Sequence, residues 1–512
     1  MAPDLKRIII LGGGSAGWLT ASIIAAEHCG ANSASVQITL VESPDVATVG
    51  VGEGTWPTMR QTLRKIGISE QTFFRECDAS FKQGSQFRGW LNGTDSDAYY
   101  HPFVLPDGYL DTDLHRYWQQ HCQNISYADA FTTQTHLCKR GLAPKQLATP
   151  DYAAVVNYGY HLNVGKFGQL LQRHATQNLG VQHVLDHVTD VNGLNNGDIG
   201  SLSTRDNGEL EADLFIDCSG SASLLLGKHF GVAWHDCRPF LFNDRAIATQ
   251  IPYNDPQAPI ASTTISTAQP EGWIWDIALP TRRGVGHVYA SNFTDDEQAE
   301  LYLRQYAARD IGGKSAEQLN VKAIKFEPGH REHFWHRNCV AVGMAAGFIE
   351  PLEASALVLV ELGAEMIRDE LPKNREMMDF VARNYNNKFR YRWERVIEFL
   401  KLHYVLSQRE EDYWQAHRHP ASIPDCLAEK MQLWRHRPPS EYDFDRKGEI
   451  FPSASYQYVL YGMGFHTEAR ATNKAADYDK IIERHLTENK RKLNKYVTGL
   501  PSNRALISHL NR

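Results

Sequence analysis

The chain has 512 residues, of which 42% are hydrophobic and 22% are charged, so it is long enough for more than one domain and should bury a normal globular core. Its formal net charge of −7 argues against a nucleic-acid-binding protein. No apolar run reaches the length of a membrane span, so we expect a soluble protein without a membrane partner. The absence of paired cysteines fits a reducing cytoplasm.

The chain begins with the pattern of a strand, a glycine-rich turn and a helix. The apolar run Lys6–Leu11 ends directly in the turn Gly12–Gly17, the helical stretch Trp18–Ala26 follows, and a second strand, Val36–Val41, ends on Glu42. A secretory signal would also place basic residues before an apolar run, but here glycines interrupt that run. The order of the parts predicts a dinucleotide-binding βαβ unit in which the Glu42 carboxylate accepts hydrogen bonds from a ribose.

Each position of the G-x-G-x-x-G turn has a physical task in such a unit. Gly12 permits the tight turn, Gly14 lets the backbone approach the pyrophosphate, and Gly17 lets the helix pack closely against the strand. The phosphates are expected at the positive end of the helix, which Ser15 and Ala16 begin.

Further elements follow along the first half of the chain. A second glycine-rich loop, Val49–Pro57, leads into a helix, and the next helix, Ser69–Cys77, starts with a residue suited to N-capping. Residues 105–154 are aromatic and polar with little periodicity, as in an insertion that covers a site. The pattern then predicts a helix at Asn163–Leu179 and a strand at Leu210–Cys218 that returns to the nucleotide-binding sheet.

The second half contains antiparallel strands and then long helices. Residues 247–289 alternate apolar and polar side chains in places, which favours antiparallel strands. Asn338–Val342 is a predicted buried strand, and the pattern from Glu361 to Val405 is long and helical. Additional helices are predicted at Tyr456–Tyr461 and Ala475–Tyr496.

Segments of one nucleotide-binding sheet are therefore separated by other parts of the chain, which predicts two interleaved modules. The nucleotide-binding module is expected to comprise residues 1–104, 155–235 and 330–370. The substrate-covering module, largely helical at its C-terminus, is expected to comprise residues 105–154, 236–329 and 371–512.

Cysteine spacing gives no metal or redox motif. None of the eight cysteines forms a CxxC pair, so we expect neither a zinc site nor a redox pair and predict no metal ligands. Cys218 and Cys339 lie in apolar runs and are expected to be buried small hydrophobic residues in a reducing compartment.

Several motifs beyond the glycine turn are shared with one enzyme family. The chain resembles the flavin-dependent tryptophan halogenases over nearly its whole length. The resemblance is carried by the segments Gly12–Trp18, Val49–Pro57, Ser80–Phe87, His101–Phe103, Phe215–Gly220, Trp273–Ile277 and Asn338–Ser355. It implies a mixed α/β fold in which a Rossmann-like, glutathione-reductase-type module binds FAD, as in flavin monooxygenases, and is interleaved with the substrate module.

The chain departs from the family pattern at three places. Ala278 stands where proline usually follows the Trp-x-Trp-x-Ile element, and Ala354-Ser355 replaces a Ser-Thr pair. Tyr456 stands where the family commonly has a tryptophan that stacks on a substrate indole. These changes leave the flavin chemistry intact and bear on the substrate.

The resemblance implies an FADH2- and O2-dependent halogenase that makes hypohalous acid at the flavin, from chloride or bromide, and delivers it to an electron-rich aromatic such as an indole. Lys82 would direct the hypohalous acid, and Glu353 would orient it and take a proton from the ring. Ser355 and Ala356 would bind halide through backbone N–H groups. Substrate contacts are expected from His101, Phe103 and Tyr456, and a barrier between substrate and flavin from Trp273 and Trp275.

The resemblance also implies cofactor contacts and partners. The expected FAD contacts are Gly12, Gly14, Ser15, Ala16, Gly17, Glu42, Val51, Gly52, Glu53, Val188, Met344 and Leu357. Because the chain has only one full G-x-G-x-x-G turn, we expect a separate NAD(P)H-dependent flavin reductase to supply FADH2. The other expected partner is the aromatic small molecule, and a homodimer stays open.

Three alternatives stay open at this point. A flavin-dependent aromatic hydroxylase would share the fold, but it needs its substrate against the flavin, where the two tryptophans would stand. A non-catalytic flavoprotein would need neither Lys82 nor Glu353. Without the resemblance, these two residues would be read as a structural ion pair.

Overall fold

The computed structural model describes residues 3–30, 36–46, 52–446, 448–468 and 472–511. The chain divides into two compact units, each built from three stretches. The first unit is Met1–Asp78, Leu162–Cys237 and Phe326–Trp393, and the second is Ala79–His161, Arg238–Lys325 and Glu394–Arg512. Two boundaries differ from those of the expected modules by more than twenty residues, and the other three lie within seven residues of them. Residues 79–104 belong to the second unit because their strands join its sheet, and residues 371–393 belong to the first.

A six-stranded sheet forms the centre of the first unit. Its strands, in order across the sheet, are β20 (Trp335–His336), β21 (Cys339–Ala341), β12 (Leu214–Asp217), β1 (Arg7–Leu11), β2 (Gln37–Glu42) and β8 (Gln182–Leu185). All neighbours are parallel except β20 and β21. Four of the five residues of β1 are buried, as expected for a parallel strand that is covered on both faces.

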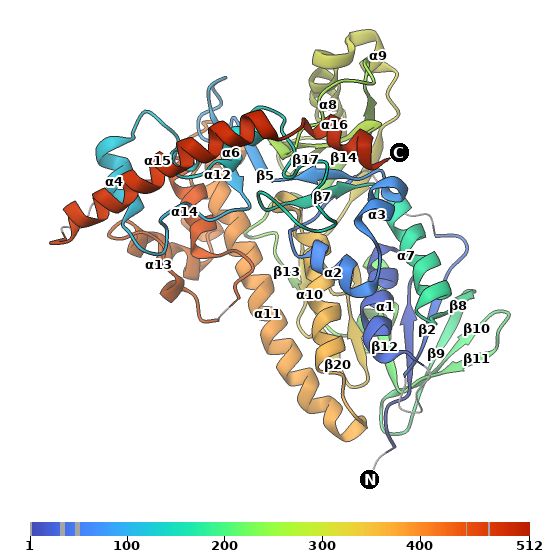
Figure 1. The fold of residues 1–512 in the computed structure, drawn as a ribbon. Coiled ribbons are helices and arrows are strands. Elements are labelled where there is room, and N and C mark those ends of the chain that lie inside the picture. The colour runs from blue at the N-terminus through green and yellow to red at the C-terminus, as the bar shows by residue number, and fades with distance from the viewer. Residues whose placement is uncertain (1–2, 31–35, 47–51, 447, 469–471, 512) are drawn as a thin grey trace. The chain divides into compact units, whose positions relative to one another are not determined.

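Helices cover this sheet and tie its connections together. In Figure 1, α1 (Ser15–His28) lies beside α7 (Val164–Asn178), and it also contacts α10 (Ser355–Asp369). The preceding segment forms α2 (Met59–Ile66) and α3 (Glu70–Cys77); as predicted, Ser69 caps α3 by accepting the N–H of Thr72. Two three-stranded sheets complete the unit: β9 (Val188–Gly193), β10 (Ile199–Thr204) and β11 (Glu209–Glu211), and β13 (Trp234–Asp236), β19 (Gly329–Arg331) and β22 (Gly347–Phe348).

Two predicted elements of the first unit are wrong in extent. The strand predicted at Leu210–Cys218 is two strands, β11 and β12, in different sheets, and the Asp213 carboxylate between them accepts N–H bonds from Lys6 and Arg7 at 2.8 Å each. The helix predicted at 361–405 is divided into α10 and α11 (Arg375–Val405). Pro372 lies in the break, where its missing N–H and fixed φ disfavour a continuous helix.

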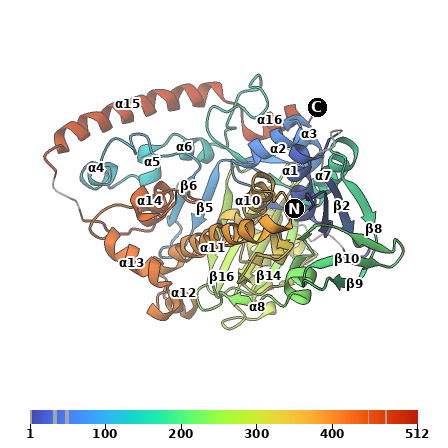
Figure 2. The ribbon, with the colours of Figure 1, turned by 90° about the horizontal axis from the view of Figure 1, so that it is seen from below.

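A seven-stranded sheet forms the centre of the second unit. Its order is β18 (Lys322–Lys325), β14 (Arg245–Pro252), β17 (Arg282–Tyr289), β16 (Gly272–Ala278), β15 (Thr264–Gln269), β5 (Gly84–Arg88) and β6 (Ala98–Pro102). Only β15 and β5 are parallel neighbours, which confirms the antiparallel strands predicted for residues 247–289. Helix α8 (Asp296–Ile311), seen near β14 and β16 in Figure 2, buries Leu303 and Tyr306 against Ile247 and Ile274.

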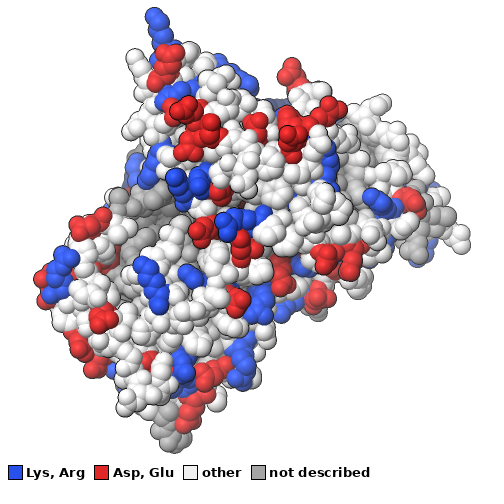
Figure 3. Space-filling view, turned by 180° about the vertical axis from the view of Figure 1, so that it is seen from behind, with Lys and Arg blue, Asp and Glu red and all other residues white. Residues whose placement is uncertain are grey.

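Helices make up much of the rest of the second unit. The insertion at 105–154, predicted to lack periodicity, contains α4 (Leu114–His121), α5 (Tyr127–Phe131) and α6 (Gln134–Lys139), which are too short to show a clear period. The C-terminal stretch forms α12 (Asp412–His417), α13 (Asp425–Trp434), α14 (Ser453–Gly462), α15 (Ala475–Gly499) and α16 (Asn503–Leu510). None of the helices in the described part of the chain has the length and apolarity needed to cross a bilayer. Acidic and basic side chains are interspersed over the face shown in Figure 3.

A buried carboxyl group joins α2 to α10 in the first unit. Glu361 of α10 accepts hydrogen bonds from the hydroxyls of Thr62, at 2.6 Å, and Thr58, at 3.1 Å. Burial raises the pKa of Glu361 to about 8, because the two hydroxyl donors only partly offset the cost of desolvating a carboxylate. The group is therefore protonated in the folded protein at neutral pH.

Replacing Glu361 by glutamine should flatten the pH dependence of stability. The folded chain keeps a proton that the unfolded chain releases above the ordinary pKa of 4.5. The free energy of unfolding therefore falls as pH rises from there to about 8, by up to about 1.4 kcal/mol per pH unit. Glutamine keeps the shape of the protonated carboxyl but does not titrate.

Thermal unfolding of the wild type and of Glu361→Gln over this pH range measures the effect. Glu370→Gln, at the end of the same helix and half-buried beside Lys388, is the matched control and should keep the wild-type slope. An unchanged slope in Glu361→Gln would contradict the prediction.

Candidate active site

The glycine turn lies where the carboxyl ends of the parallel strands meet. Gly12, after β1, has φ +118°, and a Cβ there would lie 2.2 Å from the carbonyl oxygen of Cys218, after β12. A Cβ on Gly17 would lie 1.9 Å from the carbonyl oxygen of Gly12. Both positions therefore require glycine. A Cβ on Gly14, in contrast, would meet no described atom within 4 Å, so this face of the turn is open to an approaching phosphate.

The acidic residue at the end of β2 lies beside this turn. A Cβ on Gly13 would lie 2.0 Å from the carboxyl carbon of Glu42, so the carboxylate lies against the turn. Oε2 of Glu42 is 3.0 Å from Nε2 of His183. Ser15 and Ala16 begin α1, and neither a capping side chain nor an acidic residue occupies its first turn. An open glycine, an uncapped helix N-terminus and a nearby carboxylate fit the pyrophosphate and ribose of FAD.

Other residues predicted to contact FAD lie on neighbouring segments of the first unit. A Cβ on Gly343 would lie 2.7 Å from Cβ of Ala16, so the turn that carries Met344 packs on the start of α1. Val188 begins β9, two residues after Asp186, whose N–H donates to the carbonyl of Glu42 at 2.9 Å. Among the remaining predicted residues, Leu357 is buried in α10 and Glu53 begins β3 (Glu53–Gly54). Gly52 has a φ of +114°. Val51 lies outside the described residues.

The segment around Glu353 has an unusual backbone. Glu353 and Ala354 both adopt left-handed conformations, with φ of 61° and 54°, which non-glycine residues rarely occupy. The indole N–H of Trp56 donates to the carbonyl of Glu353 at 2.8 Å and helps to hold this geometry. Trp56 belongs to the motif Val49–Pro57, but its role was not predicted from the sequence.

Helix α10 begins immediately after this strained pair. Its first residues are Ser355 and Ala356, and its N-cap is Ala354, which has no capping side chain. The Glu353 side chain is 5% exposed. A carboxylate and the N–H groups of a helix N-terminus therefore follow each other directly along the chain, and the latter can bind an anion.

Lys82 belongs to the second unit, whereas Glu353 belongs to the first. Lys82 is the last residue of β4 (Ser80–Lys82) and is 0% exposed. Its ammonium lies 5.4 Å from the ring centre of Phe103. Burial and the charge of Lys82 lower the pKa of His161 well below its ordinary value, so this imidazole is neutral. His161 lies on β7 (Gly159–Leu162), the strand paired with β4, and was not predicted as a site residue.

The residues predicted to contact substrate differ in their surroundings. Nε2 of His101 is 2.8 Å from Oγ of Ser455, and the ring of Phe103 is half-buried beside Lys82. Tyr456 is 0% exposed and packs against three aromatic rings, those of Phe399, Phe444 and Trp434. Its packing is that of a core residue, and its neighbour Ser455 contacts the histidine.

The two tryptophans of the Trp-x-Trp-x-Ile element lie on one face of β16, as the two-residue spacing predicts. Trp273 and Trp275 are both buried, and their ring centres are 6.5 Å apart at an angle of 65°. Gly286 of β17 is the register partner of Trp275, and a Cβ there would lie 2.1 Å from the Trp275 ring. Only glycine leaves room for the indole in this orientation.

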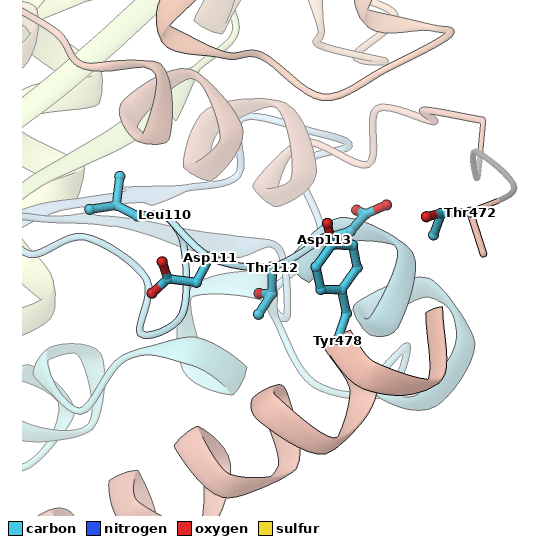
Figure 4. Close-up of a pocket in the computed structure, with 6 residues that line it drawn as sticks. All are labelled: Leu110, Asp111, Thr112, Asp113, Thr472 and Tyr478. Atoms are coloured by element: carbon cyan, nitrogen blue, oxygen red, sulfur yellow. The ribbon is translucent and has the colours of Figure 1, made fainter. Parts of the chain in front are cut away.

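A surface pocket of the second unit is formed by other residues. It has a volume of about 360 Å³. Figure 4 shows its lining, which consists of Leu110, Asp111, Thr112, Asp113, Thr472 and Tyr478. None of these residues was predicted for the site, and Asp113 already caps α4 by accepting the N–H of Arg116.

Comparison with known proteins gives a consistent family. The tryptophan halogenase family model matches residues 7–478. The structure of a tryptophan halogenase from Shewanella frigidimarina NCIMB 400 is similar, with a TM-score of 0.96 and 49% identity over 99% of this chain and 98% of that chain. The tryptophan 6-halogenase SttH of Streptomyces toxytricini is 30% identical over 487 residues, 90% of each sequence. BrvH, a flavin-dependent halogenase from Brevundimonas sp. BAL3, has a TM-score of 0.85 and 29% identity over 100% of both chains.

These matches confirm the resemblance to the flavin-dependent tryptophan halogenases that the sequence motifs indicated. They also confirm the mixed α/β fold with a Rossmann-like FAD-binding part. They favour halogenation over hydroxylation and over a non-catalytic role, with FADH2 and a halide as the reactants that the family uses. The chain belongs to the tryptophan halogenase family of flavin-dependent enzymes.

Proposed function

We propose that this protein transfers chlorine or bromine to an electron-rich aromatic ring, such as an indole, and that Lys82 directs the halogen. The observation that carries the proposal is the environment of Lys82, which is fully buried beside an aromatic ring. When bound, reduced FAD supplies the activation of O2 that converts halide into hypohalous acid. The remaining tasks, which are to hold, direct and deprotonate, fall to the side chains of this chain.

Burial gives Lys82 a chemical use that an exposed lysine lacks. An ammonium in a water-poor site can donate a strong hydrogen bond to hypohalous acid, and an amine in such a site can accept the halogen. The neutral ring of His161 adds no second positive charge, because its pKa is held well below the ordinary value. Phe103, over which the ammonium lies, provides an aromatic wall of the kind that an indole would pack against.

Glu353 and the start of α10 supply the complementary functions. Electrophilic attack on an aromatic ring leaves a cation that must lose a proton, and a buried carboxylate is a suitable base. The N–H groups at Ser355 and Ala356 offer a site for the halide ion. The left-handed backbone of Glu353 and Ala354 supports this assignment, since strained conformations of this kind concentrate at functional sites.

Trp273 and Trp275 support halogenation against the alternative of hydroxylation. A hydroxylase must bring its aromatic substrate into contact with the flavin. Two buried indoles on one face of β16 make a rigid wall, and we assign to them the barrier that keeps substrate and flavin apart. His101, bound to Ser455, and Phe103 are the proposed substrate contacts, whereas Tyr456 supports them from the core.

The proposed activity is tested with the purified chain, chemically reduced FAD, O2 and either chloride or bromide. Indole and tryptophan are offered separately, and the products are identified by mass spectrometry. We expect replacement of one ring hydrogen by halogen. Products that contain an added oxygen atom and no halogen would contradict the proposal and show that the chain is an aromatic hydroxylase.

Replacing Lys82 should separate the two halves of the reaction. Lys82→Met keeps an unbranched side chain but removes the nitrogen, and Lys82→Ala removes both. We expect aromatic halogenation to fall by at least about 100-fold in each, because a positioned acid–base group contributes that much. Hypohalous acid, measured with a small diffusible trap, should still form.

Lys145→Met is the matched control, since Lys145 is also buried in the second unit and lies 5.8 Å from the ring centre of Tyr158. It should keep normal halogenation. Retained halogenation in the Lys82 variants would refute the role of Lys82.

The supply of reduced flavin gives a separate prediction. With oxidised FAD and NADH or NADPH, the chain alone should reduce flavin no faster than buffer does, because its sequence holds one dinucleotide turn and we assign that turn to FAD. Adding a flavin reductase should restore halogenation. Rapid flavin bleaching by this chain alone, followed at the flavin absorption band, would contradict the need for a partner.

A further inference from the structure

Three possible metal ligands meet on one small sheet of the first unit. His235 lies on β13, and Cys237 follows two residues later, immediately beyond the end of that strand. His330 on β19 is the antiparallel register partner of His235. One ligand atom from each of the three side chains lies within 4.8 Å of the others.

Strand geometry accounts for this meeting. Residues two apart on an extended chain point to the same face, and direct cross-strand partners have neighbouring side chains. The N–H of Cys237 donates to the carbonyl of Pro328 at 2.9 Å, which continues the pairing of the two strands. The rings of His235 and His330 are stacked with centres 4.9 Å apart. The register of β13 and β19 therefore places all three side chains together.

The hydrogen bond made by Nδ1 of His330 leaves Nε2 of the same ring available to bind a metal. Its Nδ1 is 2.9 Å from the carbonyl oxygen of Arg331. A carbonyl oxygen only accepts, so Nδ1 carries the proton and Nε2 presents a lone pair. A backbone carbonyl that holds the distal N–H is the arrangement found behind metal-bound histidines.

We propose that His235, Cys237 and His330 bind a zinc ion, with solvent at the fourth position. Two imidazoles and one sulfur suit zinc, whereas magnesium and calcium prefer oxygen ligands. Zinc–ligand bonds of about 2.0–2.3 Å require the three atoms to lie about 3.5 Å apart. Binding therefore requires the exposed side chain of His235 to move closer to the other two ligands, and the same exposure gives the ion a path of entry.

Cys237 is the decisive ligand, because its buried sulfur carries a negative charge when it binds a metal and distinguishes zinc from the cations that prefer oxygen ligands. On binding, a zinc–sulfur bond replaces the sulfur–hydrogen bond, and the proton leaves to solvent. The resulting thiolate offsets one of the two positive charges of the ion.

The zinc site would stabilise the segment that leads to Glu353, the proposed base of the reaction. β19 also pairs with β22, with His330 opposite Gly347, and the chain reaches Glu353 six residues after Gly347. An ion that joins β13 to β19 would hold the strand that leads to this carboxylate. Zinc binding itself does not depend on the proposed halogenation and can be tested without turnover.

Cobalt is the spectroscopic probe for this site. The full chain, stripped with a chelator, is titrated with Co²⁺ and the absorption is recorded. We expect one Co²⁺ per chain with a thiolate-to-cobalt charge-transfer band that Zn²⁺ then abolishes. Cys237→Ser should lose the band, and His330→Gln should weaken Co²⁺ binding by at least about tenfold.

Cys122→Ser is the matched control, because Cys122 is half-buried and also has a histidine beside it, His121, in the sequence. It should keep the band. Thermal unfolding gives a second readout, since zinc should raise the Tm of the wild type and of Cys122→Ser but not that of Cys237→Ser. Absence of the band in the wild type, or its survival in Cys237→Ser, would overturn the proposal.

Discussion

The close approach of backbone segments at the carboxyl edge of the parallel sheet is the constraint on which the first unit depends. Gly12 touches Cys218, and Gly17 touches Gly12, at distances that exclude any Cβ. Glycine at these positions is therefore a steric requirement of the fold before it serves a cofactor. Once the turn closes in this way, the helix start faces the open side of Gly14, and β2 brings Glu42 beside it. The sheet order thus creates the edge at which we place the nucleotide of FAD.

A second constraint lies in the backbone before α10. Glu353 and Ala354 occupy conformations that cost about 1–3 kcal/mol each, so the surrounding structure must hold them. The hydrogen bond from Trp56 is one such restraint, and the burial of both residues is another. The result is that a carboxylate and an anion-binding helix end occur in consecutive residues. A relaxed helix would place neither group in this relation.

In the second unit, burial sets the environment of the proposed catalytic lysine. A fully buried lysine is costly, and it is retained beside an aromatic ring and a histidine that stays neutral. The Trp275 ring instead occupies the space that a side chain at position 286 would fill, because residue 286 is glycine. The surroundings of Lys82 and Trp275 thus differ, since Lys82 ends a buried strand and Trp275 packs closely over Gly286.

Local sequence patterns determined the glycine turn, the Ser69 cap and the antiparallel strands, because sterics and periodicity act between near neighbours. Only the tertiary structure decided where patterns end, as in the division of Leu210–Cys218 between two sheets, since Asp213 acts on a distant strand. It also decided that Tyr456 packs in the core. The cluster around Cys237 was missed because cysteine spacing was the criterion. The His-x-Cys spacing was visible, but the third ligand comes from strand register, which depends on contacts between residues almost a hundred positions apart.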